Sequence, residues 1–577
     1  MGRSLAVCES AFPMTSLRRA PVRGLLALVL AALTAGLMVV SLVGAPAQAA
    51  PDRPAGAPAP ATAPGDDDLT NEQVAEQALE TVEAAIAPGE PDTAAQPDPA
   101  AHQEFTSALR DLSSLQDYLS PAKQKVAQRL LARPTDPVST CSDSDYACFG
   151  SAPVQKLCNA LICVHYTKTG PHRVPGDNNG PGGSWNGTAG GAPDYVEFTL
   201  ATMTTVAKRY VNAGYRPVVS DEGADGTAQT DIYVADIGGG AFPLYGYCWT
   251  NDAENAHVTV APYCVLDNDY KSSQFPTHTP QGNLRVTAAH EFFHAVQFAY
   301  DFYEDAWFFE STATWAEDIF YDTVNDNRQY LPYGPLGRPA KSLDLWSGLT
   351  PYASWIFMQF LGQRFPASQG DMPVIIREIW EKLSHTGTGA ESMYSVQAIS
   401  SALEARGTDL TTEFAKFTAW NRRPRSFYAE GAAYRPAGLS SSYRISPSDT
   451  AKRVRFSLDH LSARHYRFTS DFRGSKRLEI KVNLNDREAG GFAYVLFKPR
   501  GEGARLRVIP LNAAGNATVT YPFGSSVDWI EVDAVNASAR YTACDTAPAD
   551  ERPYYTCGGR PVDDRMAQAI TVRAVNP

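Results

Sequence analysis

The chain has 577 residues, of which 44% are hydrophobic, and a formal net charge of −13. This acidic excess argues against a nucleic-acid-binding protein, because nucleic acids select basic surfaces. Beyond the N-terminal region, no segment of the sequence is long and apolar enough to span a membrane.

The N-terminus has the pattern of a secretory signal peptide. Three arginines precede an apolar run at residues 24–44, and residues 47–49 form a small-x-small cleavage motif. The apolar run is also long enough for a membrane anchor, but Pro46 and the cleavage motif favour removal. We therefore expect residues 1–49 to be a signal peptide and the mature protein to be secreted, without membrane contact.

Cysteine usage agrees with an oxidising compartment. Of nine cysteines, one falls in the signal peptide, and the remaining eight are an even number. Local pairing predicts the disulfides Cys248–Cys264 and Cys544–Cys557. Two further disulfides are expected among Cys141, Cys148, Cys158 and Cys163, with connectivity left open. A structural zinc site is disfavoured, because the spacings of these four differ from close C-x2–4-C pairs.

Residues 50–136 differ from the rest in composition. The stretches 51–68 and 88–100 are rich in Ala, Pro, Gly and Asp, which is typical of flexible linker. Helices are predicted at 74–86, opened by a capping box, and at 122–131, opened by Ser-Pro. Two interpretations stay open: a propeptide that silences an enzyme during export, or a solvated spacer.

Residues 137–430 are predicted to form one α+β domain, with a small mixed sheet followed by a mostly helical lobe. Strands are predicted at 161–169, 231–237 and 257–266, and helices at 194–211, 352–365, 374–383, 396–404 and 410–420.

The sequence His290-Glu291-Phe292-Phe293-His294 lies in a strongly helical setting. Residues four apart on a helix lie one turn above each other, so both imidazoles point to the same side. Two such histidines provide half of a catalytic zinc site, with Glu291 beside them as general base. The alternative is an amphipathic core helix whose histidines bond to backbone carbonyls.

Catalytic zinc takes three protein ligands, so a third must be found. Gln297 and Tyr300 stand where a metzincin has its Gly and third His, which excludes that class. Glu310 and Glu317 are seven residues apart and can face one side of a helix. Two helical turns separate them by about 10.5 Å, so one must be the ligand and the other a supporting group.

Weaker patterns indicate calcium. Asp221, Asp225 and Asp231, or the run 267–269 (Asp-Asn-Asp), could surround a calcium ion. Neither has the spacing of an EF-hand loop, and Asp and Asn serve equally well in turns without metal.

Residues 440–577 change to short alternating strands, the clearest at 454–458, 478–482, 493–497, 529–532 and 570–572. This pattern predicts an all-β sandwich, and it looks like the non-catalytic modules of secreted hydrolases. No aromatic stripe marks this region as a carbohydrate binder, and fold alone supplies no function for it.

Two resemblances extend the metal hypothesis. The segment 307–317 resembles the second zinc helix of gluzincin aminopeptidases, W-L-N-E-G-F-A followed by a second Glu, although Ser311 and Thr312 replace its Gly and Phe. That resemblance implies that Glu310 is a ligand and that Glu317 orients a ligand histidine. Residues 160–365 resemble a group of secreted bacterial zinc metallopeptidases, through V-H-Y-T-x-x-G, P-D-Y-V-E, D-N-D-Y, H-E-F-F-H-A-V-Q and E-x-T-A-T-W.

The implied function is a secreted zinc peptidase of gluzincin type, acting on proteins or peptides. Zn²⁺ would be held by His290, His294 and Glu310, and Glu291 would move the proton. Tyr352 is a candidate for stabilising the oxyanion, or simply an aromatic packing residue. The alternative is a secreted binding or surface protein with a vestigial zincin fold, whose β-sandwich makes the contacts. The cleavage specificity and the oligomeric state are left open.

Overall fold

The computed structural model describes residues 70–87, 105–176, 191–240, 243–251, 259–383, 393–544 and 555–577. The predicted signal peptide and both predicted linkers lie outside the described residues. The described residues belong to one compact unit.

A five-stranded mixed sheet precedes the helix that carries His290 and His294, and its strand order is β1-β2-β3-β5-β4. Strands β2, β3 and β5 run parallel, and β1 and β4 pair antiparallel at the two edges. The bounds are β1 Val154–Cys158, β2 Ile162–Thr167, β3 Thr230–Ala235, β4 Gly246–Trp249 and β5 Tyr263–Asp267. The three inner strands correspond to the three predicted from sequence, although β5 covers only the second half of the strand predicted at 257–266. The short edge strands were not predicted.

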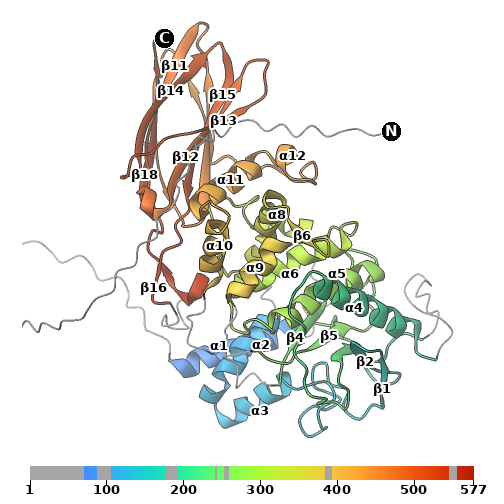
Figure 1. Cartoon of the computed structure of the whole chain (residues 1–577). Helices are drawn as coiled ribbons and strands as arrows, with labels where there is room; N and C mark the ends of the chain where they lie inside the picture. The colour runs from blue at the N-terminus through green and yellow to red at the C-terminus, as the bar shows by residue number, and fades with distance from the viewer. Residues whose placement is uncertain are drawn as a thin grey trace, which may run out of the picture. The chain divides into compact units, whose positions relative to one another are not determined.

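Two helices cover one face of this sheet. α4 (Asp194–Asn212) packs on β2, α5 (Pro280–Gln297) packs on β5 and β4, and the two helices contact each other (Figure 1). α6 (Ala306–Tyr321) packs along α5. α5 is buried along nearly its whole length, which brings the motif histidines into the interior.

The remaining lobe is mostly helical, as predicted. Its helices are α7 Thr350–Ala353, α8 Trp355–Arg364, α9 Val374–Leu383, α10 Ser395–Glu404, α11 Leu410–Arg422 and α12 Pro424–Phe427, with short strands β6 Ser368–Gln369 and β7 Met372–Pro373. The single helix predicted at 352–365 is divided at Ser354, whose hydroxyl donates to the carbonyls of Leu343 and Thr350. A separate 3-10 segment, Asp326–Tyr333, follows α6.

In the described part of the chain before the sheet there are three α-helices: α1 Asn71–Ile86, α2 Phe105–Leu115 and α3 Pro121–Leu130. α1 and α3 confirm the predicted helices, whereas α2 was not predicted. Leu79 of α1 and Leu109 and Leu112 of α2 are buried in the same hydrophobic core as the sheet and the lobe. These helices are therefore packed against the domain, so a solvated spacer does not describe them.

The C-terminal region is β-rich, as predicted. Its strands are β8 Ser441–Ile445, β9 Ala451–Leu458, β10 Ser462–Ser470, β11 Ser475–Asn483, β12 Gly491–Pro499, β13 Arg505–Val508, β14 Asn516–Gly524, β15 Val527–Asn536, β16 Tyr541–Thr542, β17 Arg560–Pro561 and β18 Met566–Val575. They form one sheet in the order β13-β12-β15-β10-β8 and another in the order β14-β11-β18-β9. Inward residues of both sheets, among them Phe468, Val495, Ile480 and Val572, share one core, so the two sheets pack face to face.

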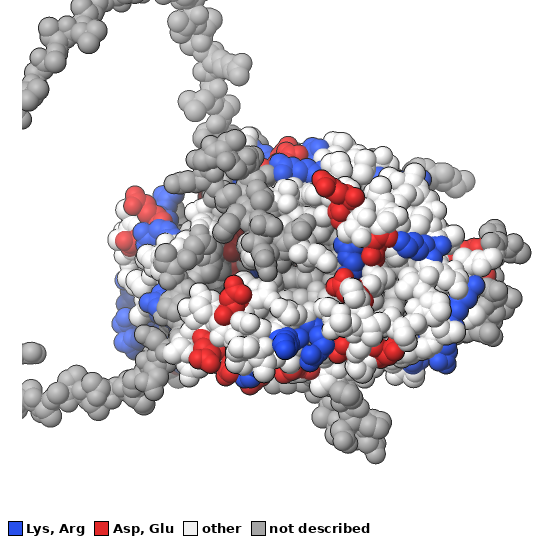
Figure 2. Space-filling model, turned by 90° about the horizontal axis from the view of Figure 1, so that it is seen from below, with Lys and Arg blue, Asp and Glu red and all other residues white. Residues whose placement is uncertain are grey.

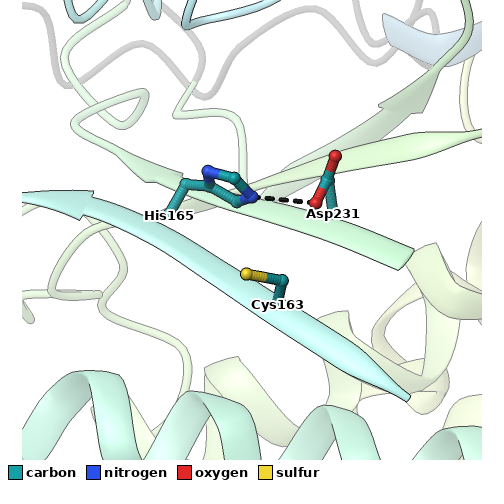
Figure 3. A group of neighbouring side chains, drawn as sticks. All are labelled: Cys163, His165 and Asp231. Atoms are coloured by element: carbon teal, nitrogen blue, oxygen red, sulfur yellow. Dashed lines mark hydrogen bonds and ion pairs between the residues drawn. The ribbon is translucent and has the colours of Figure 1, made fainter. Parts of the chain in front are cut away.

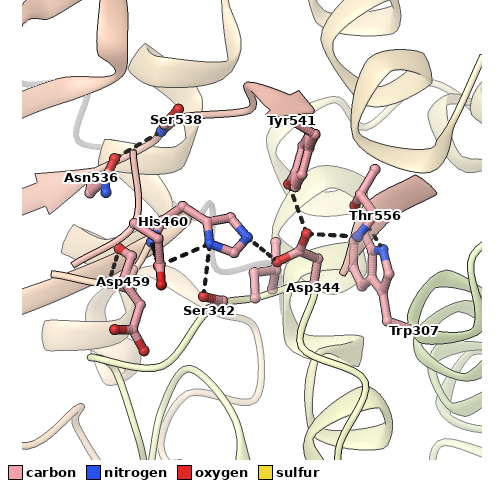
Figure 4. Close-up of polar contacts among 12 residues, drawn as sticks. Trp307, Ser342, Asp344, Asp459, His460, Asn536, Ser538, Tyr541 and Thr556 are labelled. Atoms are coloured by element: carbon pink, nitrogen blue, oxygen red, sulfur yellow. Dashed lines mark hydrogen bonds and ion pairs between the residues drawn. The ribbon is translucent and has the colours of Figure 1, made fainter. Parts of the chain in front are cut away.

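A buried polar network ties this region to the helical lobe (Figure 4). Asp344 lies 2.8 Å from Nε2 of His460 and accepts hydrogen bonds from the Tyr541 hydroxyl and the Thr556 amide. Thr556 in turn accepts from the indole of Trp307, on the first turn of α6. The C-terminal region is therefore held directly against the start of the helix that carries Glu310.

The described residues contain four disulfides: Cys141–Cys148, Cys158–Cys163, Cys248–Cys264 and Cys544–Cys557. Both individually predicted pairs are confirmed, and the first four cysteines pair in chain order. Such a set fits a secreted, disulfide-bonded protein. Among the described helices, none combines the length and apolarity that crossing a membrane requires.

Candidate metal centre

The two motif histidines lie on the inner side of α5. The helix begins with Thr279 as N-cap, whose hydroxyl accepts from the Gly282 amide at 3.1 Å, and with Pro280 in its first turn. The ring centroids of His290 and His294 are 4.8 Å apart. The helical spacing therefore presents both imidazoles to one point, as expected.

Glu310, fully buried on α6, completes a set of three. One of its carboxylate oxygens lies 3.3 Å from Nε2 of His290, and the other lies 3.5 Å from Nε2 of His294. Two atoms bound tetrahedrally to one zinc at about 2.1 Å are about 3.4 Å apart. One ligand atom from each of the three residues lies within 4.8 Å of the other two, which is close enough for all three to reach a single ion.

The protonation of His294 provides a second test of that fit. Gln297 donates through Nε2 to the Phe309 carbonyl (3.1 Å) and to the Thr312 hydroxyl (3.0 Å). Its Oε1 therefore accepts from Nδ1–H of His294 at 2.7 Å. Burial, and then the charge on His290, hold the pKa of His294 well below its usual range. This imidazole is therefore neutral, with its proton on Nδ1.

The bare Nε2 of His294 has no hydrogen-bond partner and faces a carboxylate oxygen of Glu310. Two electron-rich atoms at this distance in a buried site repel each other. A cation between them converts the repulsion into coordination, and a neutral imidazole is the form that binds metal. The residues present therefore fit a bound divalent metal.

Glu317 occupies the other side of His290. Its carboxylate lies 2.7 Å from Nδ1 of His290, so it accepts that proton and directs Nε2 toward Glu310. Burial raises the pKa of Glu317 to about 7, although the hydrogen bond from His290 opposes this. Burial disfavours charge on His290, but Glu310 and Glu317 outweigh it and raise the His290 pKa well above its usual range. Without a metal this imidazole is therefore protonated on both nitrogens, and a bound metal would replace the proton on Nε2.

Glu291 lies beneath the edge strand β4. A Cβ added at Gly246 would come within 2.8 Å of Cγ of Glu291 and 2.9 Å of a methyl group of Thr287. Only glycine therefore lets the strand approach this carboxylate so closely. Glu291 itself is 4% exposed.

Tyr352, on α7, lies beside the same centre. Its ring is stacked on the His290 imidazole at a centroid distance of 6.0 Å and also contacts Tyr330 at 5.0 Å. It is half-buried. This position is compatible with either predicted role, and the oxyanion role stays a prediction.

Three groups around the centre were not identified from the sequence: Gln297, Gly246 and Arg110 of α2. Gln297 follows His294 by three residues, so helical spacing could have placed it beside that ring. Arg110 donates to the carbonyls of Phe302 and Glu304 and lies over the ring of Phe309, which stacks on His294. Arg110 is far from His290 and His294 along the chain, so the sequence gives no sign of this contact.

A second group of Cys163, His165 and Asp231 has ligand-like spacing (Figure 3). Cys163 is bonded to Cys158, so its sulfur is not a thiolate. His165 is hydrogen-bonded to Asp231 at 2.8 Å. This group is therefore explained without a metal.

The predicted calcium ligands have other partners. Arg133 donates to Asp221 at 3.1 Å and to Asp231 at 3.0 Å, and Thr135 donates to Asp225 at 2.5 Å. A buried guanidinium thus supplies positive charge among these carboxylates, and calcium binding here stays a prediction.

The second predicted calcium site, at 267–269, is organised as a turn. Asp267 accepts from the backbone amides of Gly238, Asp269 and Tyr270. Burial raises the pKa of Asp267 to about 7 despite these bonds. Its carboxylate oxygens are used by the backbone, which accounts for the residue without an ion.

No protein-family model and no curated protein matches this chain. Among solved structures, the pre-peptidase C-terminal domain of a collagenase from Bacillus anthracis is 9% identical, covering 24% of this chain and 96% of that chain (TM-score 0.15). Aeromonas hydrophila PliG, a periplasmic inhibitor of g-type lysozyme, is 9% identical. That match covers 23% of this chain and 97% of PliG (TM-score 0.13). CorA, a surface-associated copper-binding protein of Methylomicrobium album BG8, is 11% identical. That match covers 24% of this chain and 98% of CorA (TM-score 0.14). These TM-scores are too low to bear on fold or function.

Proposed function

We propose that this chain is a secreted zinc-dependent peptidase of gluzincin type, with a zincin-like sheet and helical lobe. The observation that carries the proposal is the convergence of His290, His294 and Glu310, with a bare, buried Nε2 directed at a carboxylate. An amphipathic core helix would instead satisfy that nitrogen with a donor. The orientation of His290 by Glu317 supports the same assignment.

The proposed chemistry divides between metal and protein. When bound, zinc polarises a scissile carbonyl and lowers the pKa of a water to about 7. Glu291 takes the proton of the attacking water and returns it to the leaving nitrogen. Gln297 and Glu317 keep the two imidazoles in the required tautomers. Tyr352 is proposed to stabilise the oxyanion.

Metal removal tests this function. The purified protein is expected to hydrolyse a mixed library of peptides, to lose that activity on dialysis against a chelator, and to regain it with stoichiometric Zn²⁺. Restoration should also raise the melting temperature, because ligand binding to the folded state stabilises it. A protein that binds zinc and melts higher, yet cleaves no peptide, would favour the alternative of a secreted binding protein.

We further propose that the N-terminal helices act as a propeptide, which is one of the two interpretations that the sequence left open. Thr106 of α2 accepts the amide of Cys248 on the outer edge of β4, at 3.2 Å. Phe105 packs edge-on against Tyr247 of the same strand. An extended peptide would pair with this edge, beside Glu291, by adding a strand. α2 occupies that place.

Weakening this contact is expected to increase activity. Thr106→Val removes a hydrogen bond worth about 1 kcal/mol, which corresponds to about a fivefold rise in the fraction with a free edge. The readout is hydrolysis of a long peptide, compared with Lys125→Ala on the exposed surface of α3. Unchanged or reduced activity, with an unchanged melting temperature, would mean that α2 is a permanent part of the fold.

A further inference from the structure

The two sheets of the C-terminal region have different outer faces. The outer face of the first sheet is attached to the helical lobe: Arg422 of α11 forms a bidentate pair with Glu531 of β15, and Tyr494 contacts Thr418. Leu496 and Val535 on that side belong to the core of the lobe. On the outer face of the second sheet, in contrast, Arg453, Lys481 and Thr518 are exposed.

Strand register arranges that second face as a trough. Across the sheet, Arg453 of β9 pairs with Thr571 of β18, Thr571 pairs with Lys481 of β11, and Lys481 pairs with Thr518 of β14. β18 therefore supplies a small floor residue between two long cationic side chains. Because neighbouring strands are about 4.8 Å apart, the backbones carrying the two walls are about 9.6 Å apart.

The next outward row repeats this arrangement. Arg455 pairs with Ala569, and Ala569 pairs with Asn483, which again places a small residue between longer ones. Asn483 donates to the side chain of Asn516 at 2.7 Å, and Asn512 accepts from the Asn516 amide. The result is a groove of about 370 Å³ lined by Arg453, Lys481, Asn483, Asn512, Thr518 and Thr571 among others.

This face is basic, although the chain carries a net charge of −13. Its outward positions hold five basic side chains and one acidic side chain, Glu479, which pairs with Lys481 at 3.6 Å and Arg573 at 3.5 Å. The five are Arg453, Arg455, Arg477, Lys481 and Arg573. On the face of the molecule seen in Figure 2, acidic and basic side chains are instead interspersed.

We propose that this groove binds an acidic polysaccharide, which lies along β18 between Arg453 and Lys481. Sulfate or carboxylate groups of the ligand pair with the two cations, and its hydroxyls bond to the asparagine amides and threonine hydroxyls. None of the groove-lining residues is aromatic, so the stacking platform of a single-stranded nucleic-acid site is missing from this lining. The lining also has no aromatic anchor of the kind found at protein hot spots.

The site is independent of the metal centre, so it can be tested whether or not peptide hydrolysis is observed. The full mature chain is titrated against heparin, polygalacturonate, neutral dextran and a single-stranded oligonucleotide, at low and at moderate salt. Heparin or polygalacturonate is expected to bind with an affinity that falls as salt rises. Dextran and the oligonucleotide are expected to bind at least tenfold more weakly.

Two kinds of variant locate the site. Arg453→Gln with Lys481→Gln removes two charge-assisted contacts and should weaken binding about 100-fold. Arg500→Gln with Arg505→Gln makes the same change in net charge on exposed residues beside β12 and β13, which belong to the other sheet. This double variant should bind the polysaccharide with an affinity within about twofold of the unsubstituted protein. Ala569→Tyr fills the floor of the trough without changing charge and should also weaken binding.

Three results would contradict the proposed binding site. Equal losses in the two double variants would show a response to net charge alone and would overturn the site. Dextran or oligonucleotide binding as tight as that of the acidic polysaccharide would overturn the ligand class. No binding to either acidic polysaccharide would overturn the proposal, provided that thermal melts show all variants folded.

Discussion

Glu291→Gln is expected to lose peptide hydrolysis while keeping its metal and its fold. The substitution preserves the size of a side chain that is 4% exposed beneath β4, and it removes the carboxylate that we propose accepts the proton. General acid–base catalysis contributes about 10²- to 10⁴-fold, so the rate should fall by that factor. Zinc content should be unchanged, because His290, His294 and Glu310 are intact.

Glu404→Gln on the exposed surface of α10 is the matched control and should keep full activity. The measurement is the rate of peptide hydrolysis at equal zinc occupancy. Retained activity in Glu291→Gln would remove Glu291 from the proposed mechanism. Loss of zinc together with activity would instead assign Glu291 to metal binding.

Glu310→Ala and Glu317→Ala are expected to affect zinc to very different degrees. Glu310 lies against Nε2 of both histidines, so its loss would leave only two of the three proposed protein ligands, and the purified variant should retain little zinc. Glu317 lies against Nδ1 of His290 and acts only through that ring, so its loss should weaken zinc binding by about 10- to 100-fold.

Zinc affinity is measured by competition with a coloured chelator, and Glu404→Ala serves as control. Glu310→Gln keeps the volume of the buried side chain and separates metal loss from misfolding. If Glu317→Ala lost more zinc than Glu310→Ala, the two carboxylates would have to exchange roles.

The sequence was most informative where helical periodicity applies. The four-residue spacing of His290 and His294 and the seven-residue spacing of Glu310 and Glu317 each place side chains on one helix face. The packing of α6 along α5 then brings these four residues together. The resemblance to the gluzincin motif, and not spacing, distinguished Glu310 from Glu317.

Contacts between distant segments were not predictable in this way. β4 has only four residues and β1 five, so neither gave a clear alternation. The pairing of Arg133 with Asp231 spans 98 residues, and no local pattern in the sequence indicates it. The contact of Thr106 with β4 spans 142 residues and depends on how α2 packs, which local propensity does not determine.

The zinc content of the purified, unsubstituted protein tests the central claim most directly. Elemental analysis after zinc-replete expression, with His294→Ala prepared in parallel, should give about one zinc per chain for the parent and much less for the variant. A parent value near zero, or equal zinc in both proteins, would contradict a metal centre at His290, His294 and Glu310.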